Sequence, residues 1–523
     1  MINQKFEQYI PKNVKAELIG NAVSFEVLPL QIQQIASDLF TQNKISLKNI
    51  VATDEIKENG YYKISYIFGV PKENIFIIPY IKIKDSNEFS SIAPIIHVAG
   101  GYERKIHAFF GLTPVGNPDP RRIILHENWP TNIFPLRKDF SYTTRPQDAN
   151  GVYQFQKVEG EGIYEIPVGP IHAGIIEPGH FRFSVAGESI VLLEPRLGFT
   201  HKGSEKLFEI LLIDEKIKLS EKISGDSSFS HSLAFCQALE QLSNIAVPNR
   251  ALYLRVLYAE LERLANHFGD IGAIMIDTGF SFGGAHGARL REMIMQINEQ
   301  LTGSRFLRGV NVIGGVTCDL DNDSITKLLN DLTNIYKDFS QVINVAQNSV
   351  SLLNRLKGTG VLTRESALNH GVVGVAGRAV GIKQDARFDY PYAAYNDLLI
   401  DEIPLEEDGD VYARFNIRIG EVDASIKIIQ KLLSNLPNGD VNVGKIPTTF
   451  KKNSFSVSII EGWRGEIVYF VSTDSNGNIS RVAPRDPSFV NWPALPDAGF
   501  DNIVPDFPLI NKSFNLSYSG NDL

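Results

Sequence analysis

The most constraining stretch of this sequence is a polar, glycine-centred segment at residues 222–231, which stands directly before an apolar helical pattern. That pattern is formed by Phe229, Leu233, Phe235, Leu239 and Leu242. A hydroxyl or carboxylate side chain just before a helix can accept a hydrogen bond from the unpaired N–H groups of its first turn. The sequence therefore predicts a loop entering a helix, with Ser224, Asp226 or Ser227 as the capping residue.

A second helical pattern, over residues 251–269, combines an apolar face with a stripe of charge. The stripe places Glu260, Arg263, His267 and Asp270 at i, i+3, i+7 and i+10. Such a stripe is either solvated surface or a buried polar chain. Burial requires paired charges, because isolated ions inside a protein are prohibitively unstable. The sequence leaves both alternatives open.

Length and composition exclude several classes of protein. A chain of 523 residues is expected to form two or three domains, and its net charge of -9 offers no attraction for nucleic acid or an anionic membrane surface. Cys236 and Cys318 are too few for a disulfide framework or a Cys-x-x-Cys metal site, which indicates a reducing compartment. No apolar run reaches about 18 residues and no signal peptide is apparent, so direct membrane insertion is not expected.

The N-terminal part of the chain reads as a small α+β domain. Short alternating apolar runs predict strands at residues 22–27, 61–69 and 74–84, and a helix over 29–43. We assign this domain to residues 1–142.

The rest of the chain is predicted to form a polar linker followed by a mainly helical domain with a peripheral β-sheet. Residues 143–162 are polar and interrupted by glycine, which predicts a linker. The domain at 163–523 is expected to contain a long helix over 321–356 and another over 418–436, with strands at 455–460 and 465–472. The predicted fold class is α+β.

The small domain carries a motif, Gly101-Tyr-Glu-Arg-Lys-Ile-His-Ala-Phe-Phe-Gly-Leu112, that is followed by Gly116-Asn-Pro-Asp-Pro-Arg-Arg122. On physical grounds alone the second segment is a surface turn with ion pairs. Together the segments resemble the signature of the smaller peripheral-arm subunit of respiratory complex I, with Lys105 replacing a Glu and Asn117 replacing a His. That resemblance implies a docking domain without a redox centre.

The large domain resembles two related families. Gly169-Pro170 and His172 are similar to the Gly-Pro-Gln-His-Pro loop of the quinone-side large subunit of complex I, whereas Glu177 and His180 are similar to the Glu-Gly-His of nickel-iron hydrogenases. The segment at 197–206 resembles a motif shared by both families, which implies that its His201 and Lys206 lie beside their central cavity.

The sequence allows two interpretations of Glu177. In its Ile-Ile-Glu-Pro setting it could be a desolvated acid with a raised pKa, suited to relaying protons. The alternative is an ion pair with Arg182 or a cap.

Residues 222–227 also follow the spacing of the Arg-x-Cys-Gly-x-Cys motif of nickel-iron hydrogenase large subunits, with Ser224 and Ser227 at the cysteine positions. The second hydrogenase pair, Asp-Pro-Cys-x-x-Cys, aligns near the C-terminal end and places Ser517 and Gly520 at its cysteines. Nickel and low-spin iron require soft, anionic sulfur. We therefore expect four vestigial positions and no metal bound by this chain. A dinucleotide fingerprint for NAD is also missing.

Taken together, the chain resembles fused small-plus-large subunits of the hydrogenase-4 and formate hydrogenlyase type, in a branch that lacks the cysteines. The resemblance implies a peripheral subunit of a membrane-bound, ion-translocating complex. It would be cytoplasmic, held on the inner face of the cell membrane by an iron-sulfur small subunit, which carries the cluster, and by antiporter-like membrane subunits. A metal-free polar cavity is expected from His172, Glu177, His201, Ser224, Asp226 and His267, with Glu177 and Asp226 as proton-relay carboxylates.

Two other functions remain. One is reduction of a quinone or another small acceptor in this cavity, as in NADH-quinone oxidoreductase. However, the Tyr and His that flank the quinone in complex I align with Gly225 and Ile176, which have no polar side-chain group. The other is a scaffold without catalysis.

Overall fold

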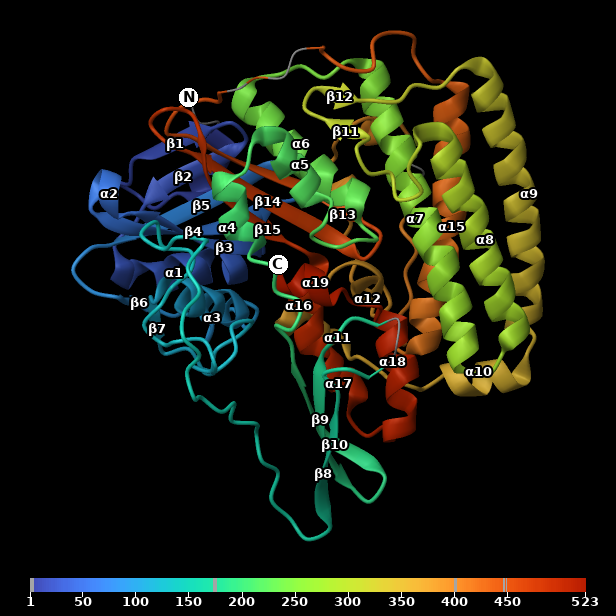
Figure 1. The fold of residues 1–523 in the computed structure, drawn as a ribbon, viewed down its shortest axis with the longest axis horizontal. Coiled ribbons are helices and arrows are strands. Elements are labelled where there is room, and N and C mark those ends of the chain that lie inside the picture. The colour runs from blue at the N-terminus through green and yellow to red at the C-terminus, as the bar shows by residue number, and fades with distance from the viewer. Residues whose placement is uncertain (1–3, 173–175, 399–401, 445–446, 448) are drawn as a thin grey trace.

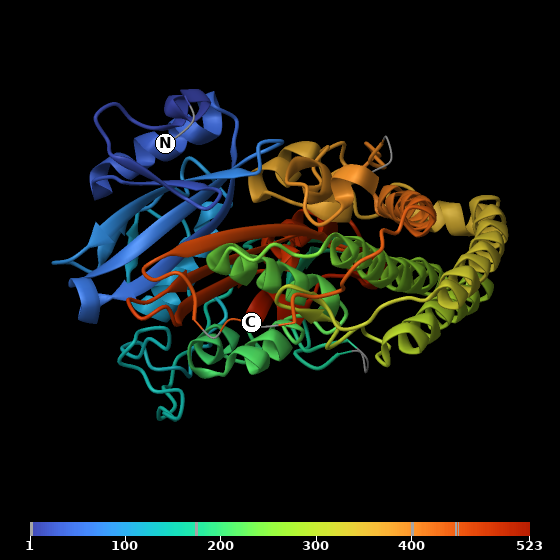
Figure 2. The ribbon, with the colours of Figure 1, turned by 90° about the horizontal axis from the view of Figure 1, so that it is seen from above.

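The computed structural model describes residues 4–172, 176–398, 402–444, 447 and 449–523 (Figure 1). A small α+β domain lies at one side of the molecule and a group of long helices at the other, with a C-terminal sheet between them (Figures 1 and 2). The α+β class predicted from the sequence is confirmed.

The small domain is built on a five-stranded sheet with strand order β1-β2-β5-β4-β3, in which β2 and β5 are parallel. Its elements are η1 (Gln4–Tyr9), β1 (Ala16–Ile19), β2 (Ala22–Glu26), η2 (Pro29–Gln31), α1 (Ile32–Ser37), η3 (Asp38–Gln42), β3 (Ser46–Glu55), α2 (Ile56–Asn59), β4 (Tyr61–Val70), β5 (Ile75–Ile83), β6 (Glu88–Ser90), α3 (Ala99–Phe110) and β7 (Thr113–Val115). Strand β3 was not predicted, because Lys48, Asn49 and Asp54 break its apolar alternation. These polar residues are buried, and Lys48 forms an ion pair with Glu466 of the large domain.

The segment at 143–162 contains no helix or strand, and it leads into a three-stranded sheet that projects from the molecule (Figure 1). That sheet consists of β8 (Ile163–Val168), β9 (His180–Ala186) and β10 (Ser189–Arg196). The Tyr153 hydroxyl donates a hydrogen bond to Glu194 Oε1 over 2.8 Å, so the segment is attached to β10 at this point.

The helical part is built around α7 (Asn249–Asp277), which packs against α8 (Ser281–Thr302) and α15 (Val411–Ser434). The other helices before α15 are α4 (Ser204–Ile210), α5 (Ile213–Ser220), α6 (Ser228–Ser243), α9 (Asn322–Gln347), α10 (Val350–Leu356), α11 (Arg364–His370), α12 (Gly374–Arg378), α13 (Ala386–Asp389) and α14 (Tyr395–Leu398). The short strands β11 (Asn311–Val312) and β12 (Gly315–Val316) form a hairpin.

Two helix predictions were wrong in their bounds. The stretch 321–356 is two helices, since α9 ends at Gln347 and the Ser349 side chain caps α10 by accepting from the Leu352 N–H. Helix α15 begins at Val411 rather than at residue 418, because Asp410 caps it by accepting from the Ala413 N–H over 2.7 Å.

The C-terminal sheet joins the two domains. Its strands β13 (Phe455–Gly462), β14 (Gly465–Thr473) and β15 (Ile479–Arg485) are antiparallel, and α6 packs against β13 and β14. An apolar layer that includes Val51, Ile67, Val457 and Val468 lies between this sheet and the sheet of the small domain. The last elements are α16 (Pro487–Asn491), η4 (Trp492–Ala494), α17 (Leu495–Gly499), η5 (Val504–Asp506), α18 (Phe507–Phe514) and α19 (Tyr518–Asp522). Within the described ranges, no helix has the length and apolar character needed to cross a membrane.

Candidate functional site

The loop before α6 is not capped by the residues that the sequence indicated. The side chain of Ser227, at the N-cap position, makes no capping bond. Instead the carboxylate of Glu262, on α7, accepts hydrogen bonds from the N–H groups of Phe229 (2.7 Å) and Ser230 (3.1 Å). Capping by Ser224, Asp226 or Ser227 was therefore the wrong reading, because a neighbouring helix supplies the acceptor and leaves these side chains available for other contacts.

The side chains of this loop contact the C-terminal segment of the chain. We define the serine site as Ser224, Asp226, Ser227, Arg464 and Ser517. Ser224 Oγ lies 2.8 Å from Ser517 Oγ and 3.0 Å from Asp226 Oδ1. The Gly520 N–H donates to Ser517 Oγ over 2.9 Å. The structure thus brings the two segments that were predicted to carry vestigial metal positions into direct hydrogen-bond contact, although almost 300 residues separate them.

Arg464 is the residue around which the serine site is organised. It lies in the turn between β13 and β14 and donates to both oxygens of Asp226, over 2.6 and 2.7 Å. The same guanidinium lies 3.3 Å from Ser224 Oγ and 3.4 Å from Ser227 Oγ, and its centre is 3.9 Å from the ring centroid of Trp463. One cation therefore contacts three of the polar side chains contributed by the loop.

The ion pair with Arg464 determines the charge of Asp226. Burial raises the pKa of Asp226, but the Arg464 guanidinium lowers it further than burial raises it, so the net pKa lies below its ordinary value. A carboxylate held in its ionised form binds no proton near neutral pH. This geometry favours an anchoring role for Asp226 over the proton-relay role expected from the sequence.

Gly520, which was predicted to be the fourth vestigial position, lies against a buried carboxylate. A Cβ atom at residue 520 would lie 2.6 Å from the carboxyl carbon of Asp486, which is closer than van der Waals contact allows. Asp486 Oδ2 is 3.0 Å from His231 Nε2, and Asp486 Oδ1 accepts from the Ser488 N–H over 2.7 Å. The Asp486 carboxylate therefore occupies the space that a side chain at residue 520 would need.

Three more of the predicted residues surround the short C-terminal helix α19. Glu177 Oε2 accepts from the Ser519 N–H over 3.1 Å, His201 Nδ1 is 2.7 Å from the Asp522 carbonyl oxygen, and the rings of His172 and Tyr518 are 6.2 Å apart. Burial lowers the pKa of His172 and of His201.

The setting of Glu177 agrees with one of the interpretations that the sequence allowed, a cap, because Glu177 accepts from the Ser519 N–H in the first turn of α19. Its side chain is exposed, so this chain does not provide the desolvation that we expected. It does not pair with Arg182 either, since Arg182 Nη1 is 2.7 Å from Glu165 Oε2. Glu177 is instead an exposed acceptor beside α19.

The remaining predicted residues lie away from α19. His180 Nδ1 is 3.4 Å from the Gly169 carbonyl oxygen, and Lys206 Nζ donates to the Arg137 carbonyl oxygen of the small domain over 2.9 Å. His267 is buried behind Trp463, with 6.2 Å between ring centroids. The expected six-residue cavity is therefore a packed network around α19, and His267 belongs to a separate cluster.

Sequence analysis missed Arg464, Asp486 and Glu262. A signal existed for Arg464, because its Trp-Arg-Gly segment falls between two predicted strands and so places a large cation in a tight turn. No comparable local signal marks Asp486 or Glu262, which reach the site from distant elements. In the described part of the chain, no group of three or more His, Cys, Asp or Glu side chains is placed to hold a metal ion.

Comparisons with known proteins place this chain in one class, the fused peripheral subunits related to complex I. Residues 25–146 match the family of the 30 Kd subunit of respiratory-chain NADH dehydrogenase, and residues 277–456 match the family of its 49 Kd subunit. Formate hydrogenlyase subunit 5 of Escherichia coli (strain K12) is 33% identical over 483 residues, which are 91% of this chain and 84% of that protein.

Two further relatives show the same organisation. Hydrogenase-4 component G of Escherichia coli (strain K12) is 32% identical over 97% of this chain and 88% of that protein. The C/D subunit of NADH-quinone oxidoreductase from Phocaeicola vulgatus is 29% identical over 77% of this chain and 80% of that protein. The chain belongs to the family of formate hydrogenlyase subunit 5 and hydrogenase-4 component G, which confirms the family that the sequence motifs indicated.

Proposed function

We propose that this chain is the large peripheral subunit of a membrane-bound, ion-translocating oxidoreductase complex, and that it holds no nickel-iron centre. Its relatives are named as subunits or components of hydrogenase and NADH-quinone oxidoreductase assemblies, which supports the first part. The second part rests on one observation, the direct Ser224–Ser517 hydrogen bond beside the Arg464 guanidinium.

The residues at the four vestigial positions do not fit a thiolate-bridged metal centre. A serine hydroxyl is a harder and far more basic ligand than a cysteine thiol, whose pKa is about 8.5. Gly520 has no side chain, and the Asp486 carboxylate fills the adjacent space. Arg464 also places a positive charge against Ser224 and Ser227, where a metal cation would have to bind.

In this proposal the chain contributes docking and coupling, while electrons pass through the cluster of an iron-sulfur small subunit and antiporter-like subunits move the ions. No observation favours a quinone site here. A cavity of about 620 Å³ lined by Asp54, Lys63 and Asp474, and another of about 590 Å³ lined by His97 and His370, both lie where the domains meet rather than beside Ser224. Quinone reduction is therefore one outcome of the tests below.

The complex purified through this chain is expected to contain iron but no stoichiometric nickel, and to turn over no dihydrogen. The reason is the hydroxyl donor set, which soft metals bind poorly. Elemental analysis by mass spectrometry and a dihydrogen uptake assay measure both, with a nickel-containing hydrogenase prepared in the same way as the positive control. Stoichiometric nickel, or dihydrogen turnover, would overturn the proposal. Quinol formation without nickel would favour the quinone alternative.

Replacing Glu177 with Gln is expected to reduce ion transport by the complex in membrane vesicles by about tenfold or more, because the amide cannot exchange a proton. The exposed carboxylate beside α19 is the candidate for the coupling group. The matched control is Glu188→Gln, another exposed carboxylate, in the turn between β9 and β10. Co-purification of partner subunits checks assembly. Unchanged transport in the assembled Glu177→Gln complex would leave a scaffold role.

A further inference from the structure

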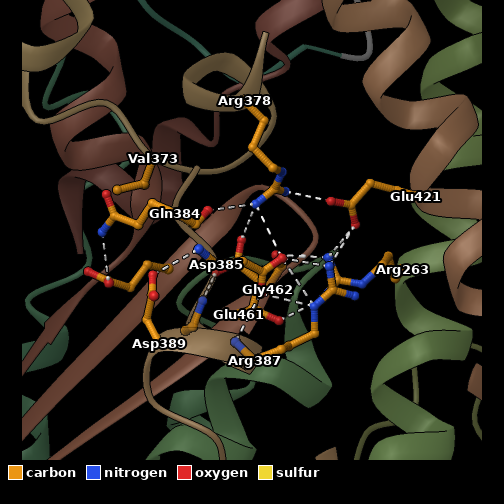
Figure 3. Close-up of polar contacts among 12 residues, drawn as sticks. Arg263, Val373, Arg378, Gln384, Asp385, Arg387, Asp389, Glu421, Glu461 and Gly462 are labelled. Atoms are coloured by element: carbon orange, nitrogen blue, oxygen red, sulfur yellow. Dashed lines mark hydrogen bonds and ion pairs between the residues drawn. The ribbon is translucent and has the colours of Figure 1, made fainter. Parts of the chain in front are cut away.

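The charged stripe of α7 is buried, and its Glu260 and Arg263 belong to a larger cluster that the serine site does not use. Figure 3 shows Arg263 among other members of this cluster. We call it the buried charge cluster; its members are Glu260, Arg263, Arg378, Asp385, Arg387, Glu421 and Glu461, each at most 2% exposed. They come from α7, α12, α13 with its capping residue, α15 and β13. The alternative of a solvated stripe is therefore wrong, and the charges are paired as burial requires.

Glu421 lies at the centre of the cluster. Its Oε1 atom is 2.7 Å from Arg378 Nη2, and its Oε2 atom is 3.2 Å from Arg263 Nη1 and 3.3 Å from Arg387 Nη2. Burial raises the pKa of Glu421, but the three guanidiniums together hold it well below its ordinary value. Glu421 is therefore ionised.

Two other carboxylates of the cluster are ionised for the same reason. Asp385 Oδ2 is 2.7 Å from Arg387 Nη2, and Glu260 Oε1 is 3.3 Å from Arg387 Nη1. Glu260 also accepts hydrogen bonds from the Tyr395 and Ser425 hydroxyls, each over 2.5 Å. Burial raises the pKa of both carboxyls, and the neighbouring guanidiniums lower it by more, so the net pKa of each is below its ordinary value.

The cluster contains four carboxyls and three guanidiniums, so full ionisation leaves one excess negative charge. An uncompensated charge in a protein interior is strongly unfavourable, and a buried carboxylate can lose its negative charge by binding a proton. Local neutrality therefore requires one proton. It can reside on the fourth carboxyl, Glu461, or on the adjacent His267.

Glu461 is the better site for that proton. Its Oε1 atom accepts from Arg378 Nη1 over 2.9 Å, but Arg378 is shared with Glu421 and Asp385. Among the residues that the structure describes, its Oε2 atom accepts only from a backbone N–H, that of Ala386, over 2.9 Å. Burial and the charge of Asp385 raise the pKa of Glu461 to about 7.

His267 is the other group that could take the proton, and its surroundings disfavour the charged form. Both ring nitrogens are buried without a hydrogen-bond partner among the described residues, and Nε2 is 3.7 Å from Glu421 Oε2. Burial lowers the pKa of His267. The imidazole is therefore neutral, which leaves Glu461 as the protonated member.

Five helices place titratable or charged groups around Glu461. These groups are Glu260, Arg263 and His267 from α7, Arg378 from α12, Asp385 and Arg387 at α13, Tyr392 and Tyr395 around α14, and Glu421 from α15. Gln384 links the cluster to Glu466, which is paired with both Lys48 and Arg485. Lys48, Arg485 and Glu466 together carry one excess positive charge. Both cations are paired with Glu466 and not with Glu461.

The buried charge cluster and the serine site share one β-turn. Arg263 donates to the carbonyl oxygens of Glu461 (2.8 Å) and Gly462 (3.2 Å), which holds the end of β13 in the cluster. Trp463 and Arg464 follow directly, and the Trp463 indole N–H donates to the Asp226 carbonyl oxygen over 3.0 Å. A charge change at Glu461 therefore acts on the same turn that positions Arg464.

We propose that the buried charge cluster is a proton-binding site, in which Glu461 takes up one proton from water and the turn at residues 462–464 links this event to the serine site. The step forms an O–H bond on the Glu461 carboxylate, breaks one in hydronium, and moves no electrons. Proton binding is a property of the folded chain. Its use in driving ion movement rests on the proposed function.

Infrared difference spectroscopy of the purified full-length chain, titrated from about pH 5 to about pH 9, tests the proposal. We expect the carbonyl stretch of a protonated carboxylic acid to disappear with a midpoint close to neutrality, and one component of this band to be missing in Glu461→Gln. Glu262 provides the comparison, because burial also raises its pKa to about 7. The Glu262→Gln variant should lose a different component and keep that of Glu461.

A band that is identical in Glu461→Gln and the unsubstituted chain would overturn the proposal. If Glu461→Gln does not fold by circular dichroism, selective ¹³C labelling of Glu or Asp carboxyls in the Glu262→Gln variant replaces it. A titrating component that shifts with Glu labelling and not with Asp labelling then supports proton binding, and the absence of such a component contradicts it. Neither result depends on metal content or on partner subunits. A negative result would therefore contradict proton binding by Glu461 but would not contradict the proposed function, which the nickel, dihydrogen and ion-transport measurements test.

Discussion

Replacing Arg378 with Met is expected to lower the free energy of unfolding by about 3–5 kcal/mol, because it removes the partner of several buried carboxylates at once. Arg378 pairs with Glu421 at 2.7 Å and Glu461 at 2.9 Å, and it lies 3.5 Å from Asp385. Methionine keeps much of the aliphatic volume, so the loss measures charge pairing rather than a cavity. Urea denaturation of the purified chain, followed by circular dichroism, gives the change.

The effect of Arg378→Met should grow as the pH rises. Without the guanidinium, the folded-state pKa of Glu461 increases further above its unfolded value, so the variant is most stable at low pH and loses stability as the carboxyl ionises. The matched control is Arg289→Met, which breaks a half-exposed ion pair with Asp338 and should cost no more than about 1 kcal/mol. Equal losses in the two variants would contradict the importance assigned to the cluster.

Replacing Lys105 with Glu is expected to destabilise the boundary between the domains by about 3 kcal/mol or more. Lys105 Nζ is 2.8 Å from Glu205 Oε2, and Arg481 Nη2 is 2.8 Å from Glu205 Oε1. Glu205 is buried, and although burial raises its pKa, Arg481 and Lys105 lower it by more, so the net pKa is depressed. The substitution would set two carboxylates against one guanidinium.

The Lys105→Glu variant should also show reversed pH dependence. In the unsubstituted chain Glu205 contributes stability that is lost as pH falls through its depressed pKa, whereas in the variant one carboxyl of the pair has a raised pKa and stability is lost as pH rises. The pH dependence is measured from the urea midpoints of unfolding, and cleavage by a protease at residues 143–162 measures how far the domain boundary has loosened. Lys82→Glu is the control, since it breaks an exposed pair with Glu26 and should have a small effect. Identical midpoints for the two variants would rule out a structural role for the Lys105 pair.

This interaction explains one departure from the family pattern. Lys105 stands where the complex I signature has a second Glu, and in this chain its partner, Glu205, comes from the first turn of α4 in the large domain. Asn117, the other departure, donates to the buried Glu103 carboxylate over 2.8 Å. Both substituted residues therefore keep a buried acid paired.

Local pattern was enough to place many elements correctly. The alternating runs at 61–69 and 74–84 became β4 and β5, and the apolar spacing at 251–269 became the central part of α7. It was not enough at β3, where buried polar residues interrupt the alternation, or at Ser349, where a cap divides a continuous helical pattern. At β3 the deciding factor is burial of polar residues in the tertiary structure, and at Ser349 it is one capping hydrogen bond. The periodicity of apolar residues predicts neither.

The sequence by itself determined the α+β class, the family, and the hydroxyl and glycine residues at the four positions that we predict to be vestigial, because these follow from residue identity and short-range spacing. Only the tertiary structure decided what surrounds them. Ser224 and Ser517 are 293 positions apart. Arg464 reaches the site from the turn between β13 and β14, Asp486 from the cap of α16, and Glu262 from α7. Burial likewise decided that the stripe on α7 is a paired internal cluster, since the same spacing suits a solvated face, and only the packing of α12, α13 and α15 removes it from water.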